Sequence, residues 1–100
     1  MKTAIITGGT SGIGLATAKI FLKNDFQCMI VGRSPEKFEK AKKTLSGNFD
    51  FVSADVGKID DCKKAVERTI EIFGSVDVLV NSAGIYSEGA VTLTDEKTFD

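Results

Sequence analysis

The sequence predicts an α/β fold in which a doubly wound parallel sheet carries helices on both faces. Short apolar runs alternate with longer amphipathic stretches in the order β-α-β-α-β-α-β, which is typical of a parallel sheet with helical crossovers. The first apolar run, residues 4–7, lacks the polar alternation of a half-exposed strand, so we expect that strand to be buried on both faces. The runs amount to about four strands and about three helices of a longer domain. With right-handed crossovers, we expect the strands in the spatial order 3-2-1-4.

Each predicted strand is one of the short apolar runs: residues 4–7, 27–32, 49–54 and 76–80. The first predicted helix runs from residue 12 to about residue 24. Its apolar residues recur at helical spacing, so we expect one buried stripe made of Ile13, Ala16, Ile20 and Phe21.

The second and third helices are predicted from their end signals. Ser34-Pro35 is a capping residue followed by proline at the first helical position, and the helix is expected to run to about residue 45, where Ser46-Gly47-Asn48 ends it. The third helix is expected from about residue 60 to residue 73, and Gly74 suits a left-handed C-terminal residue. Its predicted buried stripe is Cys62, Val66, Ile70 and Phe73.

The end of the chain predicts a longer polypeptide. Thr94-Asp95-Glu96 has the capping hydroxyl and first-turn acids of a helix start, yet the sequence stops at Asp100. The strand around residues 78–80 would also keep an unpaired apolar edge. We therefore expect residues 1–100 to be the N-terminal part of one larger domain. The alternative is a small domain that pairs this edge with a second copy.

Composition excludes several function classes. The formal net charge is −1 with no basic run, which argues against binding to nucleic acid or an anionic membrane surface. No histidine occurs, so histidine-based zinc sites and Ser-His or Cys-His nucleophiles are excluded within these residues, and we expect no metal site. The apolar start is too short for a signal peptide or a membrane span, and Cys28 and Cys62 suit a reducing compartment. These features predict a cytoplasmic protein.

A glycine-rich loop joins the first strand to the first helix. Glycines let backbone N–H groups approach an anion closely, the helix N-terminus adds a partial positive charge, and Thr10 and Ser11 add hydroxyl donors. Leu15 follows Gly14 where a nucleoside-triphosphate loop needs lysine, and the common G-x-G-x-x-G spacing is also missing. The loop predicts a phosphate site, although such turns also occur without ligands.

The pattern Thr7-Gly8-x-x-x-Gly12-Ile13-Gly14 resembles the cofactor loop of the short-chain dehydrogenase/reductase family. Further stretches follow in the order and spacing of that family: Asp55-Val56, residues 73–80, and Asn81-Ser82-Ala83-Gly84. The resemblance covers the whole chain and implies a Rossmann-type fold that binds NAD(P) at the carboxyl ends of its strands. Ser82 departs from the family, which more often has asparagine there.

The resemblance also implies roles for individual residues. The loop would face the adenosine ribose and the pyrophosphate through Gly8, Thr10, Ser11, Gly12, Ile13 and Gly14, with the Ile13 N–H on a phosphate. Asp55 would accept a hydrogen bond from the adenine amino group, and Val56 would lie against the ring. The path toward the nicotinamide ribose would be lined by Asn81, Ala83 and Gly84. A strand-end cap at Asp55 and a sheet-stabilising turn at residues 81–84 are the purely structural alternatives.

The residue that ends the second strand predicts which cofactor is preferred. NAD-binding relatives of this fold commonly place an acid there to bond the ribose 2′-hydroxyl. This chain has Gly32 followed by Arg33, whose guanidinium matches a 2′-phosphate, and Ser34 adds a hydroxyl. We therefore expect NADP(H) to be preferred over NAD(H). The alternative is that Arg33 is merely solvated or stacks on adenine in an enzyme that uses either cofactor.

The predicted function is hydride transfer between nicotinamide and an alcohol or carbonyl substrate. The family performs it with a serine and a Tyr-x-x-x-Lys pair, but here the residue four positions after Tyr86, the only tyrosine, is Ala90. We therefore name no catalytic residue, expect that group beyond residue 100, and expect these residues alone to be inactive. The resemblance also implies a small-molecule substrate and a homo-oligomer for the complete protein. The alternatives are a non-catalytic NADP-binding or interaction module and, less favoured by the loop spacing, an epimerase or dehydratase.

Overall fold

The computed structural model describes residues 1–10 and 12–82. Ser11, Ala83, Gly84, Tyr86 and the predicted helix start at Thr94 lie outside the described residues.

The sheet has the predicted topology. Its strands are β1 (Thr3–Thr7), β2 (Gln27–Gly32), β3 (Phe49–Ser53) and β4 (Val78–Asn81). All pair in parallel, in the order β3-β2-β1-β4. The order places the first strand beside the last, so their carboxyl ends, Thr7 and Asn81, lie side by side.

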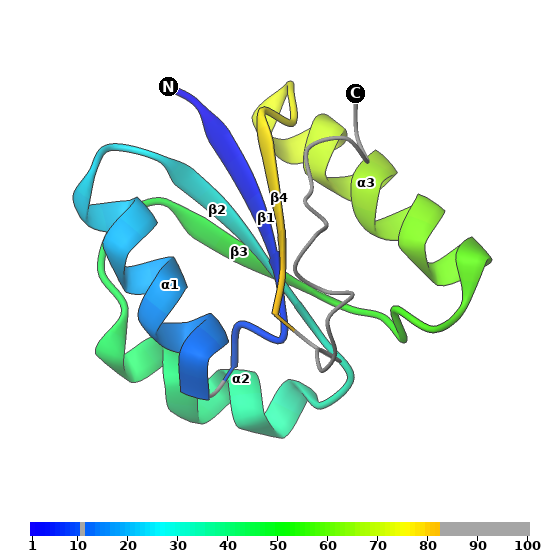
Figure 1. Ribbon diagram of the computed structural model, residues 1–100, viewed down its shortest axis with the longest axis horizontal. Coiled ribbons are helices and arrows are strands. Elements are labelled where there is room, and N and C mark those ends of the chain that lie inside the picture. Colours follow the sequence, from blue (N-terminus) through cyan, green and yellow to red (C-terminus); the bar gives the residue numbers. More distant parts are fainter. Residues whose placement is uncertain (11, 83–100) are drawn as a thin grey trace.

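Helices cover both faces of the sheet, as Figure 1 shows: α1 and α2 lie on one face and α3 on the other. Their bounds are α1 (Gly12–Lys23), α2 (Pro35–Ala41) and α3 (Ile59–Phe73). Gly74 ends α3 with a φ of 90° and donates its N–H to Ile70 at 2.8 Å, as its position in the sequence predicted.

The second helix differs from the prediction at its end. Ser34 caps it and Pro35 is its first residue, both as predicted. However, α2 ends at Ala41, and the 3-10 turn η1 (Lys42–Thr44) replaces the last part of the expected helix. The tighter turn leads into Leu45, which is buried in the core.

Two apolar clusters hold the layers together, one on each face of the sheet. On the side of α1 the cluster consists of Ala4, Ile6, Ala18, Leu22, Cys28, Ile30 and Leu45. On the side of α3 it consists of Ile5, Met29, Val31, Ala54 and Ala65. The central strand β1 is buried along its whole length, which confirms the prediction of a strand covered on both faces.

The buried stripe predicted for the first helix is wrong at Ile13, Ala16 and Ile20, which are exposed, and holds only at Phe21, which packs against the core. Ile13 is 78% exposed and Ile20 is 60% exposed. The residues of α1 that are buried are Gly14, Ala18 and Leu22. Gly14 and Ala18 are small and let the N-terminal part of the helix approach the sheet closely, so close packing, and not the spacing of the large apolar residues, selects the buried face.

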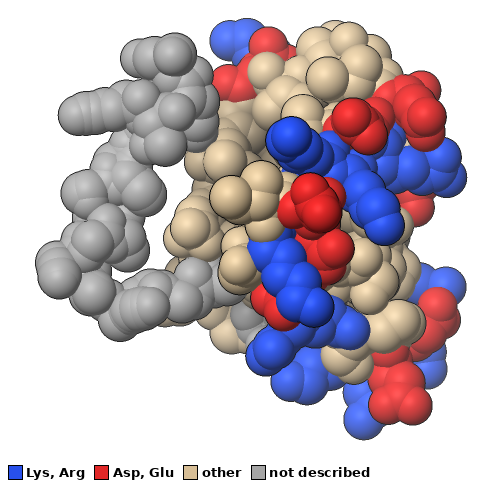
Figure 2. Space-filling model, turned by 90° about the vertical axis from the view of Figure 1, so that its right-hand side faces the viewer, with Lys and Arg blue, Asp and Glu red and all other residues tan. Residues whose placement is uncertain are grey.

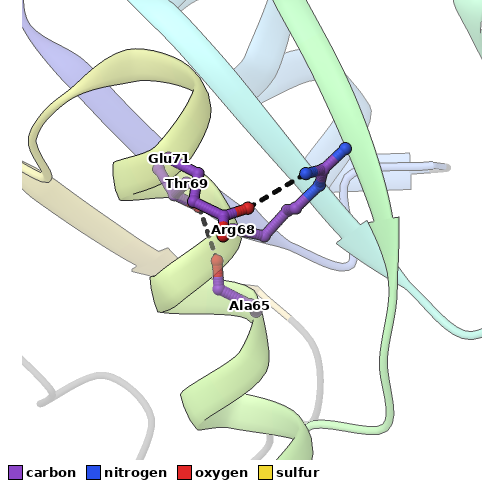
Figure 3. Close-up of polar contacts among 4 residues, drawn as sticks. All are labelled: Ala65, Arg68, Thr69 and Glu71. Carbon is purple, nitrogen blue, oxygen red and sulfur yellow. Dashed lines mark hydrogen bonds and ion pairs between the residues drawn. The ribbon is translucent and has the colours of Figure 1, made fainter.

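The stripe predicted for the third helix is wrong in part. Cys62 and Phe73 are half-buried, but Val66 is 39% exposed and Ile70 is 48% exposed. The buried residues are Ala65 and Thr69, and the Thr69 hydroxyl donates to the Ala65 carbonyl at 2.7 Å. Figure 3 shows this bond beside the ion pair of Arg68 with Glu71, which lies on the exposed side of α3. The hydroxyl can be buried because its proton has a partner within the helix.

Charges on the surface are mixed in sign. On the face shown in Figure 2, basic and acidic side chains lie next to one another. In the part of the chain that the structure describes, no helix combines the length and apolar character needed to cross a membrane.

Candidate cofactor site

A cleft of about 720 Å³ opens at the carboxyl ends of the strands. It is lined by Gly8, Thr10, Val31, Gly32, Arg33, Ser34, Lys37, Ala54, Asp55 and Val56. These residues come from the end of β2 and from the segments that follow β1, β2 and β3, which are far apart in sequence but adjacent in the sheet. The site is therefore a product of the strand order, as expected for a doubly wound sheet.

The loop after β1 depends on glycine at defined positions. Gly8 and Gly12 have φ values of 70° and 56°, a region that residues with a Cβ rarely adopt. Gly14 is required for a different reason, because a Cβ there would lie 2.0 Å from the Gly8 carbonyl oxygen. The loop therefore seats the N-terminus of α1 directly against the end of β1.

The first turn of α1 carries no acidic residue. Gly12, Ile13 and Gly14 form this turn rather than lining the cleft. The first N–H groups of a helix have no partner within the helix, and the helix dipole adds a positive potential. The Ile13 side chain is largely exposed. Helix N-termini of this kind are general anion-binding positions, so the turn is a candidate for the pyrophosphate.

The segment after β2 supplies the cations of the cleft. β2 ends at Gly32, and Arg33 and Ser34 follow it along the cleft wall. The Ser34 oxygen accepts the Lys37 N–H at 3.2 Å, and its hydroxyl proton is still available to a ligand. In the described ranges neither Arg33 nor Lys37 forms an ion pair.

Lys37 lines the cleft although the sequence motifs did not predict it. Ser34 is the helix cap, and the third residue of a capped helix lies next to its cap, so the cap itself could have pointed to Lys37. Asp55 is the only acid among the described residues that line the cleft, and it follows β3, whereas Arg33 and Lys37 follow β2. The end of the cleft near α2 is therefore electropositive.

Asp55 forms a turn and also faces the cleft. Its Oδ1 accepts the Gly57 N–H at 2.9 Å, so the structural alternative, a strand-end cap, holds for this oxygen. No hydrogen bond within the described residues uses Oδ2. Val56 follows it on the cleft wall and is 37% exposed.

Asn81 lies outside the cleft, at the end of β4. Its Oδ1 accepts the Thr7 hydroxyl at 2.9 Å, and the Ser82 hydroxyl donates to the Thr7 carbonyl. Both contacts tie β4 to β1 beneath the glycine-rich loop. Asn81 and Ser82 therefore make the sheet-stabilising contacts considered for residues 81–84, and serine at position 82 still provides a donor. No cluster of acids and cysteines able to hold a metal ion occurs in residues 1–10 and 12–82.

The comparison with protein families agrees with this geometry. Residues 2–100 match the family model described as short chain dehydrogenase. The chain belongs to the short-chain dehydrogenase family. An uncharacterized oxidoreductase of Thermotoga maritima is 37% identical over 99% of this chain, and zerumbone synthase of Zingiber zerumbet is 33% identical over 99%. The chain spans 40% of the length of each of these relatives.

Solved structures of short-chain dehydrogenases resemble the fold. A short chain dehydrogenase from Bacillus anthracis has 41% identity and a TM-score of 0.78, covering 83% of this chain and 34% of its own. An actinorhodin polyketide ketoreductase, solved with NADPH, has 31% identity and a TM-score of 0.80, covering 96% of this chain and 38% of its own. These likenesses confirm the Rossmann-type architecture predicted from the strand and helix order.

Proposed function

We propose that residues 1–100 are the cofactor-binding part of an NADP(H)-dependent oxidoreductase that transfers hydride between nicotinamide and an alcohol or carbonyl substrate. The observation that carries the proposal is the charge of the cleft at the end of β2, where Arg33 and Lys37 line the wall and Gly32 takes the place of an acid. The whole protein would be a cytoplasmic homo-oligomer that acts on a small molecule.

The adenosine end of the cofactor would occupy the cleft. Its 2′-phosphate would bind Arg33 bidentately, with Lys37 as a second cation and the Ser34 hydroxyl as a donor. Hydrogen bonds to charged groups contribute roughly 1.5–3 kcal/mol, which corresponds to roughly 10- to 150-fold in affinity. NAD(H) lacks this phosphate and would gain none of it. A solved ketoreductase with NADPH and an alcohol dehydrogenase from the archaeon Thermococcus sibiricus complexed with 5-hydroxy-NADP are among the similar structures.

The rest of the cofactor would follow the strand ends. Asp55 and Val56 would hold the adenine, and the loop from Gly8 through Thr10 and Ser11 to the first turn of α1 would hold the pyrophosphate. Asn81, Ala83 and Gly84 would lead to the nicotinamide ribose. The bound nicotinamide supplies the hydride chemistry. The residues that donate the proton to the substrate are expected beyond residue 100.

The test is cofactor binding by titration calorimetry. We expect NADPH to bind at least tenfold more tightly than NADH, and Arg33→Ala to remove most of that difference without weakening NADH. Lys40→Ala is the matched control, because Lys40 belongs to α2 but does not line the cleft. Equal or tighter binding of NADH by the unaltered protein would overturn the preference, as would an unchanged preference in Arg33→Ala.

A further inference from the structure

The first turn of α3 holds the Asp55–Val56 loop from behind. The Asp61 carboxylate accepts the backbone N–H of Asp55 at 2.7 Å through its Oδ2. Asp61 is half-buried, and this is the shortest of the contacts that close the loop. A carboxylate accepting a backbone N–H is a charge-assisted bond, stronger than a neutral one.

Asp61 does not perform the task that its position in the helix would suggest. Lys58 is the N-cap of α3, so Asp61 is the third helical residue, whose carboxylate in a capping box returns to the N-cap N–H. Here the Lys58 N–H donates to the Asp55 carbonyl at 2.9 Å instead. The Asp61 carboxylate reaches past its own cap to Asp55. It therefore serves the loop rather than the helix end.

The neighbouring residue of α3 makes a second contact with the same loop. The Cys62 thiol donates a hydrogen bond to the Val56 carbonyl at 3.3 Å. Within the loop, the Gly57 N–H donates to Asp55 Oδ1. Asp55 and Val56, which line the proposed adenine side of the cleft, are thus each held at a backbone atom by a side chain of α3. Asp61 contacts Asp55 and Cys62 contacts Val56. The orientation of Asp55 and Val56 is set before any ligand arrives.

We propose that Asp61 is a positioning residue for the adenine end of the cofactor. It fixes the backbone of Asp55, and through it the direction of the Asp55 carboxylate and of Val56 toward the cleft. The inference rests on the proposed function, since it needs adenine in this cleft. It differs from the role of Arg33 in one measurable way. Adenine is common to NADPH and NADH, so losing Asp61 weakens both equally, whereas losing Arg33 weakens NADPH alone.

The experiment compares Asp61→Ala, Asp61→Asn and Asp60→Ala by calorimetric titration with NADPH and with NADH. Asp61→Ala is expected to weaken both cofactors by roughly 10-fold, the lower end of the range for one charge-assisted hydrogen bond, because Asp61 acts on the ligand only through Asp55. The ratio of the two affinities should be unchanged. Asp61→Asn retains an accepting oxygen and should recover most of the affinity. Asp60→Ala removes the same charge from the same turn and should bind like the unaltered protein.

Amide hydrogen exchange gives a readout that does not depend on ligand. The Asp55 N–H should exchange slowly in the unaltered protein and in Asp61→Asn, and fast in Asp61→Ala. If Asp61→Ala does not fold, the second contact is tested in the same way by comparing Cys62→Ala, which removes the donor, with Cys62→Ser, which keeps one. The expected loss of cofactor affinity in Cys62→Ala is smaller, because a thiol is a weak donor.

The outcomes separate the inference from the proposed function. Equal affinities of Asp61→Ala and Asp60→Ala, or failure of Asp61→Asn to recover binding, would overturn the positioning role. If the unaltered protein binds NADH as tightly as NADPH while Asp61→Ala weakens both, the cofactor preference fails and the positioning role stands. If it binds neither cofactor, both fail.

Discussion

Gly14 is the residue at which the fold and the cofactor loop are most tightly constrained. A Cβ at this position would lie 2.0 Å from the Gly8 oxygen and 2.5 Å from the Gly8 carbonyl carbon, and backbone atoms cannot move aside as a flexible side chain does. We expect Gly14→Ala to separate α1 from the loop, to destabilise the protein by about 1–3 kcal/mol or more, and to abolish cofactor binding. Urea unfolding and calorimetric titration measure the two effects.

Gly12→Ala is the matched control for that prediction. Gly12 also needs glycine, but only for its φ of 56°, and a Cβ there would meet nothing within 4 Å. The expected cost is about 1–2 kcal/mol, from forcing an L-residue into the left-handed region. Cofactor binding should weaken less than in Gly14→Ala. Similar losses of binding in both variants would show that the contact with Gly8 is not the decisive constraint.

Gly32 is the residue whose side chain would decide between the two cofactors. Gly32→Asp places a carboxylate at the end of β2, where it would repel a 2′-phosphate and accept from a ribose hydroxyl. We expect the preference for NADPH to fall at least tenfold, measured as the ratio of calorimetric affinities for NADPH and NADH.

Gly32→Ala isolates the steric part of that substitution. A Cβ at Gly32 would lie 3.3 Å from the Thr10 methyl carbon, a tight contact that both variants share. Gly32→Ala should therefore weaken both cofactors alike and leave their ratio unchanged. A change in the ratio in Gly32→Ala would refute the electrostatic explanation.

At the scale of elements, the central strand β2 keeps a thiol protonated. Cys28 is completely buried, and burial raises its pKa from 9.0 to about 11 because the thiolate would lose its hydration. The folded state therefore retains a proton that the unfolded state has lost between these pH values. Its contribution to stability is fully present below pH 9 and is lost as the pH rises toward 11.

Two measurements check this behaviour of Cys28. With a thiol reagent at pH 8, Cys62 should react quickly in the native protein and Cys28 only on unfolding. The free energy of unfolding should fall between about pH 9 and pH 11, by at most about 2–3 kcal/mol, and Cys28→Ala should remove that part of the slope. Fast labelling of Cys28 in the native state would contradict the prediction.

The elements were predictable from the sequence, but the faces of the helices were not. Strand runs and end signals such as Ser34-Pro35 and Gly74 are local, and the structure confirms them. Which face of a helix packs depends on how closely it approaches the sheet. In α1 that face is made of Gly14, Ala18 and Leu22, and the first two are small residues that a search for large apolar side chains passes over.

At the scale of the whole molecule, the cleft too has residues that the sequence predicts and residues that only the packing of the helices reveals. The family resemblance predicted the residues after β1 and β3, and the end of the second strand predicted Arg33 and Ser34. The doubly wound order explains why these strand ends meet. The structure adds two residues from the helices that follow these motifs: Lys37 of α2 lines the cleft near Ser34, and Asp61 of α3 accepts the Asp55 N–H. Such contacts depend on the angle at which a helix leaves its loop, and the spacing of motif residues in the sequence does not determine that angle.

The outer edge of the sheet leads to a prediction about association. Within the described residues β4 pairs only with β1, and Leu79 is 36% exposed. Leu79 pairs in register with Ile5, which belongs to the core on the α3 side, and Leu79 and Val66 line one apolar cavity of about 140 Å³. An unpaired strand edge beside exposed apolar side chains favours pairing with another chain, and a net charge of −1 opposes it little.

We expect the 100-residue chain to self-associate through this edge as its concentration rises, which sedimentation velocity would detect. Leu79→Lys places a charge on the edge and should shift the distribution toward the monomer. Ile20→Lys is the matched control, because Ile20 is 60% exposed on α1 at the other face of the sheet. A chain that stays monomeric at high concentration, or equal effects of the two lysine variants, would show that β4 is not the associating edge.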